Sequence, residues 1–402
     1  MGIRAGSERG YEGPHRGALE QVKAAPVGHY SLPGAAFTFC EPGTEPVGKG
    51  VILSRRGCDL WVESVNQIGL SPIEPSADQG GKGKMKHQWI FLIALLALVA
   101  ASPAMAGMKV LAPQTIDDLV AGPPEVFARG GAFLEGPIMD LQGNLWVVSI
   151  ASGWISKISP DGTWKDVFHS GGQPQGLEWG RDGKLYGTDR KRGVFVYDPK
   201  TGKVDDYCRY FQNENFHGPN DLIFDDQGGI YFTDPWGTSP INPRGGVYYI
   251  APGGKEVKRL IDNLAFPNGI AISPDFKTLY IADCMRNYVL ACPIEAPGVL
   301  NIGFSRIFNY LPNGGWGPDG MCVDEKGNLY AAQYGGGKVI VIAPDGATIG
   351  EIKLPVGAGS ETTNVCFGTG KYASTLYITE AGDNVIWKVP MKVKGMKEWY
   401  LK

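Results

Sequence analysis

Six oxygen-bearing side chains recur at nearly the same place in six similar stretches of the chain. Each stands ten, eleven or twelve residues before an aliphatic residue that opens a strand-like run. The pairs are Glu135 with Leu145, Gln175 with Leu185, Asn220 with Ile230, Asn268 with Leu279, Asp319 with Leu329, and Asn364 with Leu376. Asn and Asp beside Pro or Gly are also common turn residues. Their recurrence in register, and the presence of a glutamate among them, favours a shared function.

A set of carboxylate and carboxamide oxygens is the donor set that a hard divalent cation prefers. We expect Glu135, Asn268 and Asp319 to be metal ligands and Asn220 to be a further ligand or a substrate contact. Gln175 and Asn364 would line the same channel. Ca²⁺ is the expected ion, with Mg²⁺, Mn²⁺ and Zn²⁺ as alternatives, although the lack of imidazole and thiolate in the set argues against zinc.

A cation held by such a set can polarise a carbonyl or phosphoryl oxygen and can lower the pKa of a bound water. Asp221 and Asp319 are the candidate bases for attack by that water. A purely structural cation is the alternative. Serine-nucleophile chemistry finds no support, since the sequence contains no GxSxG motif.

Several loop residues lie near these positions in the sequence. His217 in FHGPND, with Trp236 and Trp316, would contact the substrate beside Asn220 and Gln175, although the tryptophans could equally pack between strands. Three arginines could orient an anionic product, but we expect them on solvated faces: Arg190, Arg192 and Arg286.

The elements that must position these residues are strands. The chain of 402 residues contains 58 Gly and 29 Pro, which favours many short strands joined by tight turns. The six aliphatic residues recur at intervals of 40 to 50, and each unit contains about four strand-like runs. This pattern predicts an all-β fold, a six-bladed β-propeller with four-stranded blades, over residues 107–402. The first strand of each unit would line the central channel, and residues 125–130 would complete the last blade.

The residues before 107 have a different character. Residues 1–84 form a low-complexity N-terminal extension, which could reflect a mis-assigned start, and residues 85–106 have the layout of a signal peptide with cleavage after Ala106. We therefore expect a periplasmic or secreted protein, free of the membrane after cleavage; a cytoplasmic tail with one membrane anchor is the alternative. The net charge of −3, without a basic run, argues against a nucleic-acid partner. The sequence does not indicate an oligomeric state.

Several segments resemble the SMP-30/gluconolactonase/luciferin-regenerating enzyme family over residues 123–392. They are LEGPIMDLQGNLW, GPNDLIFDDQGGIYFTD, PNGIAISPDFKTLYIAD and GPDGMCVDEKGNLYAAQYGGGKV. The stretches NDLIFD, TDPWG and QYGGGKV are most similar to the drug-responsive lactonase branch. The resemblance implies a six-bladed propeller with one catalytic divalent cation. It places that family's metal ligands on Glu135, Asn268 and Asp319, its ligand or substrate asparagine on Asn220, and the acid of its lactonase branch on Asp221.

Two departures limit this resemblance. The stretch NENFHGPND lacks the arginine that sugar-lactonase members carry before their ND motif, and the last blade lacks the histidine of the fluorophosphatase branch. We expect a metal-dependent hydrolase that opens a lactone ring. The alternatives are phosphotriester hydrolysis at the same metal and a non-catalytic calcium-binding propeller.

Overall fold

The computed structural model describes residues 114–311 and 316–397, together with the backbone of four short strands nearer the N-terminus. The chain divides into two units, Met1–Met108 and Lys109–Lys402. In the first unit, β1 (Ser31–Leu32) pairs with β2 (Ala35–Ala36) and β3 (Leu53–Arg56) pairs with β4 (Asp59–Val62). The rest of the predicted extension, and the whole predicted signal peptide at 85–106, lie outside the described residues.

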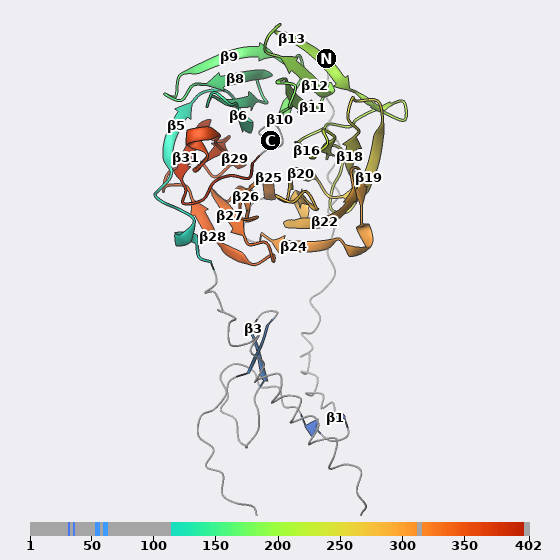
Figure 1. Ribbon diagram of the computed structural model, residues 1–402, viewed down its shortest axis with the longest axis vertical. Coiled ribbons are helices and arrows are strands. Elements are labelled where there is room, and N and C mark those ends of the chain that lie inside the picture. The colour runs from blue at the N-terminus through green and yellow to red at the C-terminus, as the bar shows by residue number, and fades with distance from the viewer. Residues whose placement is uncertain are drawn as a thin grey trace, which may run out of the picture. The chain divides into compact units, whose positions relative to one another are not determined.

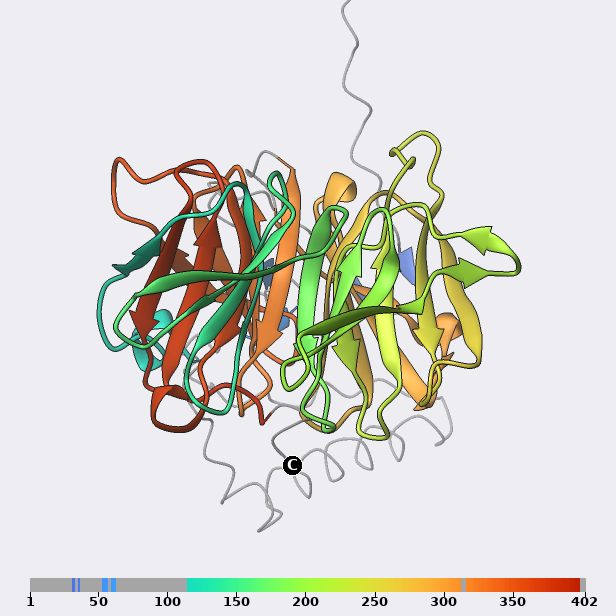
Figure 2. The same cartoon turned by 90° about the horizontal axis from the view of Figure 1, so that it is seen from above.

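Six antiparallel sheets form the blades of the second unit; five have their strands in chain order from the axis outwards, and the sixth has the early strand β5 at its outer edge. Figure 1 shows them arranged as blades around a central axis, and Figure 2 shows the disc from its side. The first blade consists of β6 (Leu134–Met139), β7 (Leu145–Ser149), β8 (Trp154–Ile158) and β9 (Trp164–His169). The second consists of β10 (Pro174–Trp179), β11 (Leu185–Asp189), β12 (Gly193–Asp198) and β13 (Lys203–Cys208). The third consists of β16 (Leu222–Phe224), β17 (Ile230–Asp234), β18 (Gly245–Ile250) and β19 (Val257–Leu264). A small hairpin of β14 (Tyr210–Phe211) and β15 (Glu214–Asn215) precedes the third blade.

The remaining blades follow the same plan. The fourth blade consists of β20 (Pro267–Ile272), β21 (Thr278–Asp283), β22 (Tyr288–Ala296) and β24 (Arg306–Tyr310), and the short strand β23 (Val299–Leu300) also pairs with β22. The fifth consists of β25 (Gly317–Val323), β26 (Leu329–Tyr334), β27 (Lys338–Ile342) and β28 (Thr348–Lys353). The sixth consists of β29 (Thr362–Phe367), β30 (Thr375–Glu380), β31 (Val385–Pro390) and β5 (Glu125–Arg129). Four short 3-10 turns interrupt the strands: η1 (Ile116–Asp118), η2 (Cys284–Arg286), η3 (Ile302–Phe304) and η4 (Gly370–Tyr372). No helix among the described residues is long and apolar enough to cross a membrane.

The ring closes by pairing an early strand with a late one. β5 joins the outer edge of β31, with Val385 opposite Arg129 and Lys388 opposite Glu125. The prediction that residues 125–130 complete the last blade is therefore confirmed. This closure ties the two ends of the repeat together and covers the outer edge of β31.

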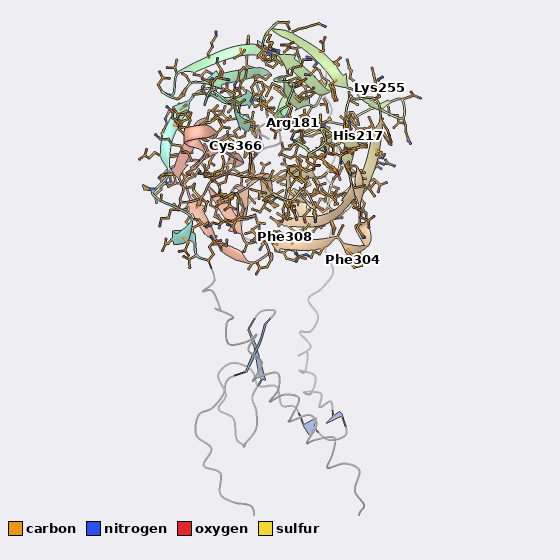
Figure 3. The ribbon with its side chains drawn as sticks, in the orientation of Figure 1. Arg181, His217, Lys255, Phe304, Phe308 and Cys366 are labelled. Carbon is orange, nitrogen blue, oxygen red and sulfur yellow. The ribbon has the colours of Figure 1, made fainter. Side chains whose placement is uncertain are left out.

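Burial decreases from the axis outwards. The inner strands β6, β10, β20 and β29 are buried along their whole length, whereas the outer strand β13 is half-buried or exposed. Figure 3 illustrates this contrast, with Cys366 of β29 near the middle of the ring and Lys255 and Phe304 at its rim. The six aliphatic residues that mark the repeat are fully buried: Leu145, Leu185, Ile230, Leu279, Leu329 and Leu376.

A repeated turn explains why the first two strands of a blade pair. Asp140 Oδ1 accepts the backbone N–H groups of Gln142 and Asn144 at 2.9 and 2.8 Å. Asp225 and Asp324 make the equivalent bonds in the third and fifth blades. Such an Asx-type turn reverses the chain within five residues and fixes the register of the two strands.

Candidate active site

The structure gathers the six registered residues at one level of the central channel. Glu135, Gln175, Asn268, Asp319 and Asn364 lie at the second or third position of an inner strand, while Asn220 lies two residues before β16. All six side chains are buried, with exposures between 2% for Gln175 and 8% for Asn220. Adjacent inner strands contact one another in the order β6, β10, β16, β20, β25, β29 and back to β6.

Contacts between neighbouring blades join these residues into what we call the polar ring: Glu135, Gln175, Asn220, Asp221, Asn268, Asp319 and Asn364. Asn364 Nδ2 donates to Glu135 Oε2 at 2.9 Å, which links the last blade to the first. A side chain at Gly269 would meet the carbonyl of Asp319, and one at Gly320 would meet the amide of Asn364. These glycines follow ring residues because adjacent inner strands approach too closely there for a Cβ atom.

A β-bulge aims the ring residues at the axis. The pairing register shifts between Glu135 and Ile138 in β6, between Pro267 and Ile270 in β20, and between Pro318 and Met321 in β25. The inner strands β10 and β29 shift at the equivalent place. A bulge bends its strand and re-aims a side chain that a regular ladder would direct into the neighbouring sheet.

Two phenylalanines take a strained backbone at the entrance to these bulges. Phe133 and Phe266 stand two residues before Glu135 and Asn268 and have φ angles of 58° and 68°. A bulky residue in this left-handed region costs about 1 kcal/mol or more. The rings meet other aromatic side chains: Phe133 stacks with Tyr334, and Phe266 lies edge-on to both Trp236 and Trp316.

Three buried carboxylates give the polar ring its electrostatic character. Burial, with the nearby charge of Asp221, raises the pKa of Glu135 to about 8, and burial raises the pKa of Asp221 to about 7. Burial and then the charges of Glu135 and Asp221 hold the pKa of Asp319 well above its usual value. Three like charges away from water are costly unless a positive charge offsets them.

Two buried side-chain oxygens of the polar ring receive no hydrogen bond from the described part of the chain. Asn268 Oδ1 and Asp319 Oδ1 are buried and have no hydrogen-bond partner among the described atoms. Within the described part of the chain, no group of three or more His, Cys, Asp or Glu is placed to hold a metal ion. A cation here would therefore depend on amide as well as carboxylate oxygens, which are donors that Ca²⁺ accepts.

The residues predicted to contact the substrate differ in their exposure to solvent. Trp236 and Trp316 are 47% and 50% exposed, so they lie open to solvent and are not packed between strands. The His217 side chain is exposed, and its backbone N–H donates to Asp234 Oδ2 at 2.9 Å. Gln175 Nε2 donates to the carbonyl of Gln173 at 3.2 Å, which ties this side chain to its own loop.

Sequence reasoning missed the residues that hold the polar ring in place. Thr188 Oγ1 accepts the N–H of Gly176 in its own blade and donates to the carbonyl of Asn220 in the next. In the same way, Thr233 Oγ1 accepts the N–H of Asp221 at 3.1 Å and donates to the carbonyl of Asn268 in the next blade at 2.6 Å. The signal was present in the sequence, because both threonines stand in the TD pair that ends the repeated second strand.

The acid of the TD pair fixes the loop that leads into the inner strand. Asp234 accepts the N–H groups of His217 and Gly218 at 2.9 and 2.6 Å. Asp283 and Glu380, at the corresponding position, accept backbone N–H groups of Ala265 and Glu361. These carboxylates are buried, and each holds the backbone of the loop before an inner strand, so their function is positional.

Arg190, Arg192 and Arg286 are all half-buried, so the expectation that they lie on solvated faces is wrong for all three. Arg192 pairs with Asp206 and Arg286 with Asp283. Arg190 is half-buried over the ring of Trp236.

A closed ring of six antiparallel blades around a buried set of acids and amides defines a six-bladed β-propeller with one polar centre on its axis. Residues 123–382 match the family model described as the SMP-30/Gluconolactonase/LRE-like region. Since this match covers more than half of the chain, the protein belongs to that family.

Similar proteins agree with this assignment. A lactonase drp35 of Staphylococcus saprophyticus is 34% identical over 249 residues, which cover 60% of this chain and 76% of the relative. A lactonase drp35 of Staphylococcus aureus strain MW2 is 33% identical over 271 residues, covering 65% and 82% of the two chains. The solved gluconolactonase XC5397 of Xanthomonas campestris aligns with a TM-score of 0.60 at 25% identity, over 69% of this chain and 92% of that one. The calcium-binding protein regucalcin of Agrobacterium tumefaciens has the same fold, with a TM-score of 0.60 at 24% identity over 69% and 96% of the chains.

Proposed function

We propose that this protein is a divalent-metal-dependent hydrolase that opens a lactone ring. Membership of the family and the lactonase relatives support the substrate class. The observation that carries the metal dependence is the pair of buried, unpartnered oxygens, Asn268 Oδ1 and Asp319 Oδ1, beside three buried carboxylates. Those oxygens and charges fit a hard cation and are costly without one.

Glu135, Asn268 and Asp319 would hold the cation, and Asn220 would complete the set from the third blade. When bound, a divalent cation supplies Lewis acidity toward the ester carbonyl and lowers the pKa of nearby water. Ca²⁺ is the ion that best suits this all-oxygen set. The other side chains of the polar ring exclude bulk water from the centre, since all of them are buried.

Asp221 is the base that we assign to the reaction. Its Oδ1 accepts the N–H of Leu222 at 3.0 Å, and its Oδ2 accepts the N–H of Ile270 at 3.3 Å. The longer bond leaves Oδ2 better able to take a proton from the attacking water. A pKa raised to about 7 by burial suits a group that takes up and releases a proton near neutral pH. Asp319 is the alternative base.

A hydrolysis screen with aldonolactones, aliphatic lactones and aryl esters tests this function. We expect turnover of at least one lactone, its loss on chelation with EDTA and its return with Ca²⁺ or another divalent ion. Equal turnover with and without EDTA would overturn the metal dependence. Faster turnover of a fluorophosphate than of any lactone would replace the proposed reaction, and no turnover of any substrate would leave a binding propeller.

We also propose that residues 85–106 direct export and are removed after Ala106. The support is the sequence pattern alone: a positive start, an apolar run and a small-residue cleavage site. N-terminal sequencing of protein recovered from the periplasm or medium should begin at Gly107. Recovery of the full chain with residue 1 intact would contradict this proposal.

A further inference from the structure

Arg190 and Trp236 form a shelf at the loops that lead into the polar ring. The guanidinium carbon of Arg190 lies 3.9 Å from the centre of the Trp236 ring, which is a close cation–π stack. Arg190 follows β11 and Trp236 follows β17, so two blades contribute to the shelf. Gly218 lies against both: a Cβ there would come within 2.9 Å of Trp236 Cβ and 3.4 Å of Arg190 Cγ. The glycine of FHGPND therefore makes room for the stack.

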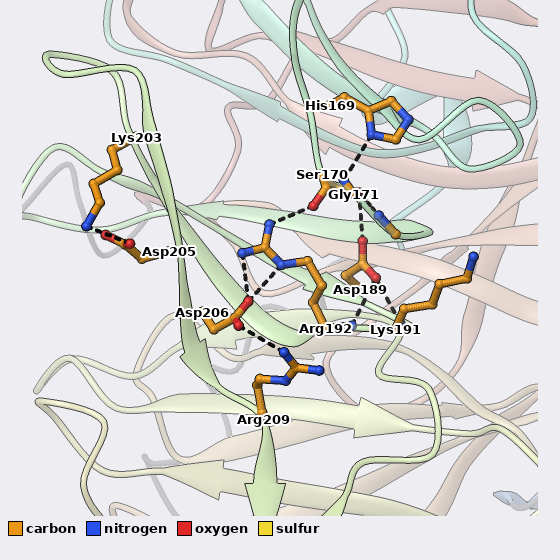
Figure 4. Close-up of polar contacts among 11 residues, drawn as sticks. His169, Ser170, Gly171, Asp189, Lys191, Arg192, Lys203, Asp205, Asp206 and Arg209 are labelled. Atoms are coloured by element: carbon orange, nitrogen blue, oxygen red, sulfur yellow. Dashed lines mark hydrogen bonds and ion pairs between the residues drawn. The ribbon is translucent and has the colours of Figure 1, made fainter.

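Hydrogen bonds fix the turn that carries Arg190, and Figure 4 shows those around the preceding residue, Asp189. The fully buried Asp189 accepts the hydroxyl of Ser170 at 2.7 Å and the N–H groups of Lys191 and Arg192 at 2.8 and 3.2 Å. The N–H of Arg190 itself donates to the carbonyl of Gln173 at 3.0 Å. The shelf is thus attached to a rigid turn, which reduces the entropy lost when the side chain binds a ligand.

Within residues 114–311 and 316–397, no acceptor meets the guanidinium donors of Arg190. Among the described residues it makes no hydrogen bond and no ion pair, whereas Arg192 donates to Asp206 at 2.7 Å and to the carbonyl of Ser170 at 2.6 Å. Arg190 is near enough to Glu135 for the two charges to interact, yet no ion pair forms between them. A half-buried planar cation with five free donors, held on an aromatic face, is the arrangement that binds a carboxylate through two parallel hydrogen bonds.

We propose that Arg190, stacked on Trp236, binds a carboxylate carried by the substrate, so that the preferred substrates are lactones bearing an acidic substituent. This inference rests on the proposed lactonase function and narrows its substrate class. The proposal also explains why no arginine is needed just before Asn220: the positive charge comes instead from Arg190, which belongs to the preceding blade. The competing explanation is that Arg190 merely offsets the charge of Glu135.

The test compares γ-butyrolactone-γ-carboxylate with the matching carboxamide, which differs in charge and little in shape. For the wild-type protein we expect kcat/KM to favour the carboxylate, and for Arg190→Gln we expect that preference to fall about tenfold or more, mainly through KM. Arg190→Lys should retain part of the preference, because it keeps the charge and loses the planar fork. Arg306→Gln, which also removes an arginine lying over an aromatic ring, is the matched control on an outer strand and should leave the preference unchanged.

Binding of the non-hydrolysable lactams separates this inference from the proposed function. Calorimetric titration with pyroglutamate and pyroglutamide requires no turnover, so it reports on Arg190 even if no lactone is hydrolysed. We expect the wild-type protein to bind pyroglutamate more tightly and Arg190→Gln to lose that difference. Equal binding of the two lactams by the wild-type protein, or an equal loss of both on substitution, would overturn the proposal. Loss of inhibition by the hydroxy-acid product, with substrate preference intact, would assign Arg190 to the product and overturn it too.

Discussion

The side-chain amide of Asn364 donates a 2.9 Å hydrogen bond to Oε2 of Glu135, across 229 positions of sequence. Glu135 Oε2 also accepts the N–H of Gly136 at 2.7 Å, so the two bonds fix the orientation of this carboxylate. The bond spans the junction at which the first and last blades meet. Closure of the propeller and the geometry of its polar centre are therefore coupled.

Asn364→Ala should weaken metal binding and stability together. Removing the amide leaves a buried carboxylate oxygen with one donor in place of two, at a cost of about 1–3 kcal/mol in the free energy of unfolding. Calorimetric titration with Ca²⁺ and urea denaturation measure the two effects. Asn309→Ala is a matched control, because its amide bonds Gly346 and Thr348 away from the polar ring. Unchanged Ca²⁺ affinity in Asn364→Ala would show that this bond does not orient a ligand.

The metal-free protein should lose stability as pH rises. Burial raises the pKa of Glu135 from 4.5 to about 8 and the pKa of Asp221 from 3.8 to about 7, so the folded state favours the protonated form of both. Between about pH 4 and pH 8 the unfolded chain binds fewer protons than the folded one, and the free energy of unfolding falls across this window. Urea denaturation in EDTA at a series of pH values should show the fall, and saturating Ca²⁺ should reduce it. Parallel curves with and without Ca²⁺ would contradict the prediction.

Thr233→Val should destabilise the junction between the third and fourth blades. The isosteric change removes the hydroxyl that accepts the N–H of Asp221 and donates to the carbonyl of Asn268. Two buried backbone groups then lose their partner, which costs about 2 kcal/mol or more. Thr233→Ser keeps the hydroxyl and should cost much less. Equal urea midpoints for the valine and serine variants would rule out the hydrogen bonds as the cause.

Gly269→Ala should disturb the polar ring by steric contact alone. A methyl group there would meet the backbone carbonyl of Asp319, which cannot move without shifting β25. We expect a loss of about 2 kcal/mol or more in the free energy of unfolding, together with weaker Ca²⁺ binding. Gly303→Ala places the same methyl group on an exposed turn with no close neighbour and should change stability by less than about 0.5 kcal/mol. A similar change in both variants would mean that the approach of β20 to β25 is not tight.

Much of the fold could be predicted because its information is local and repeated. Leu145, Leu279 and the other repeat residues are fully buried, as their even spacing indicates, and the Asp turn between the first two strands recurs in the first, third and fifth blades. Even the closing strand could be placed, since residues 125–130 precede the first blade and the last blade lacked a fourth strand. Repetition supplied several independent copies of each signal.

The site was harder to predict where its geometry departs from the repeat. Asn364 contacts Glu135 directly, although its offset of twelve made it the least regular member; the short turn η4 takes the place of the five-residue turn and shifts the count. The bulges cannot be recognised from residue type. Arg190 was misjudged because its neighbour Trp236 lies in another blade, and sequence spacing does not reveal which loops meet across two blades.

The most direct measurement of the central claim is a calorimetric titration of EDTA-treated protein with Ca²⁺, followed in parallel by lactone hydrolysis. We predict one site per chain, activity that rises in step with its occupancy, and loss of both in Asp319→Asn while the protein still folds. A protein that hydrolyses lactones at full rate with the site empty, or that binds Ca²⁺ equally well after Asp319→Asn, would contradict this account.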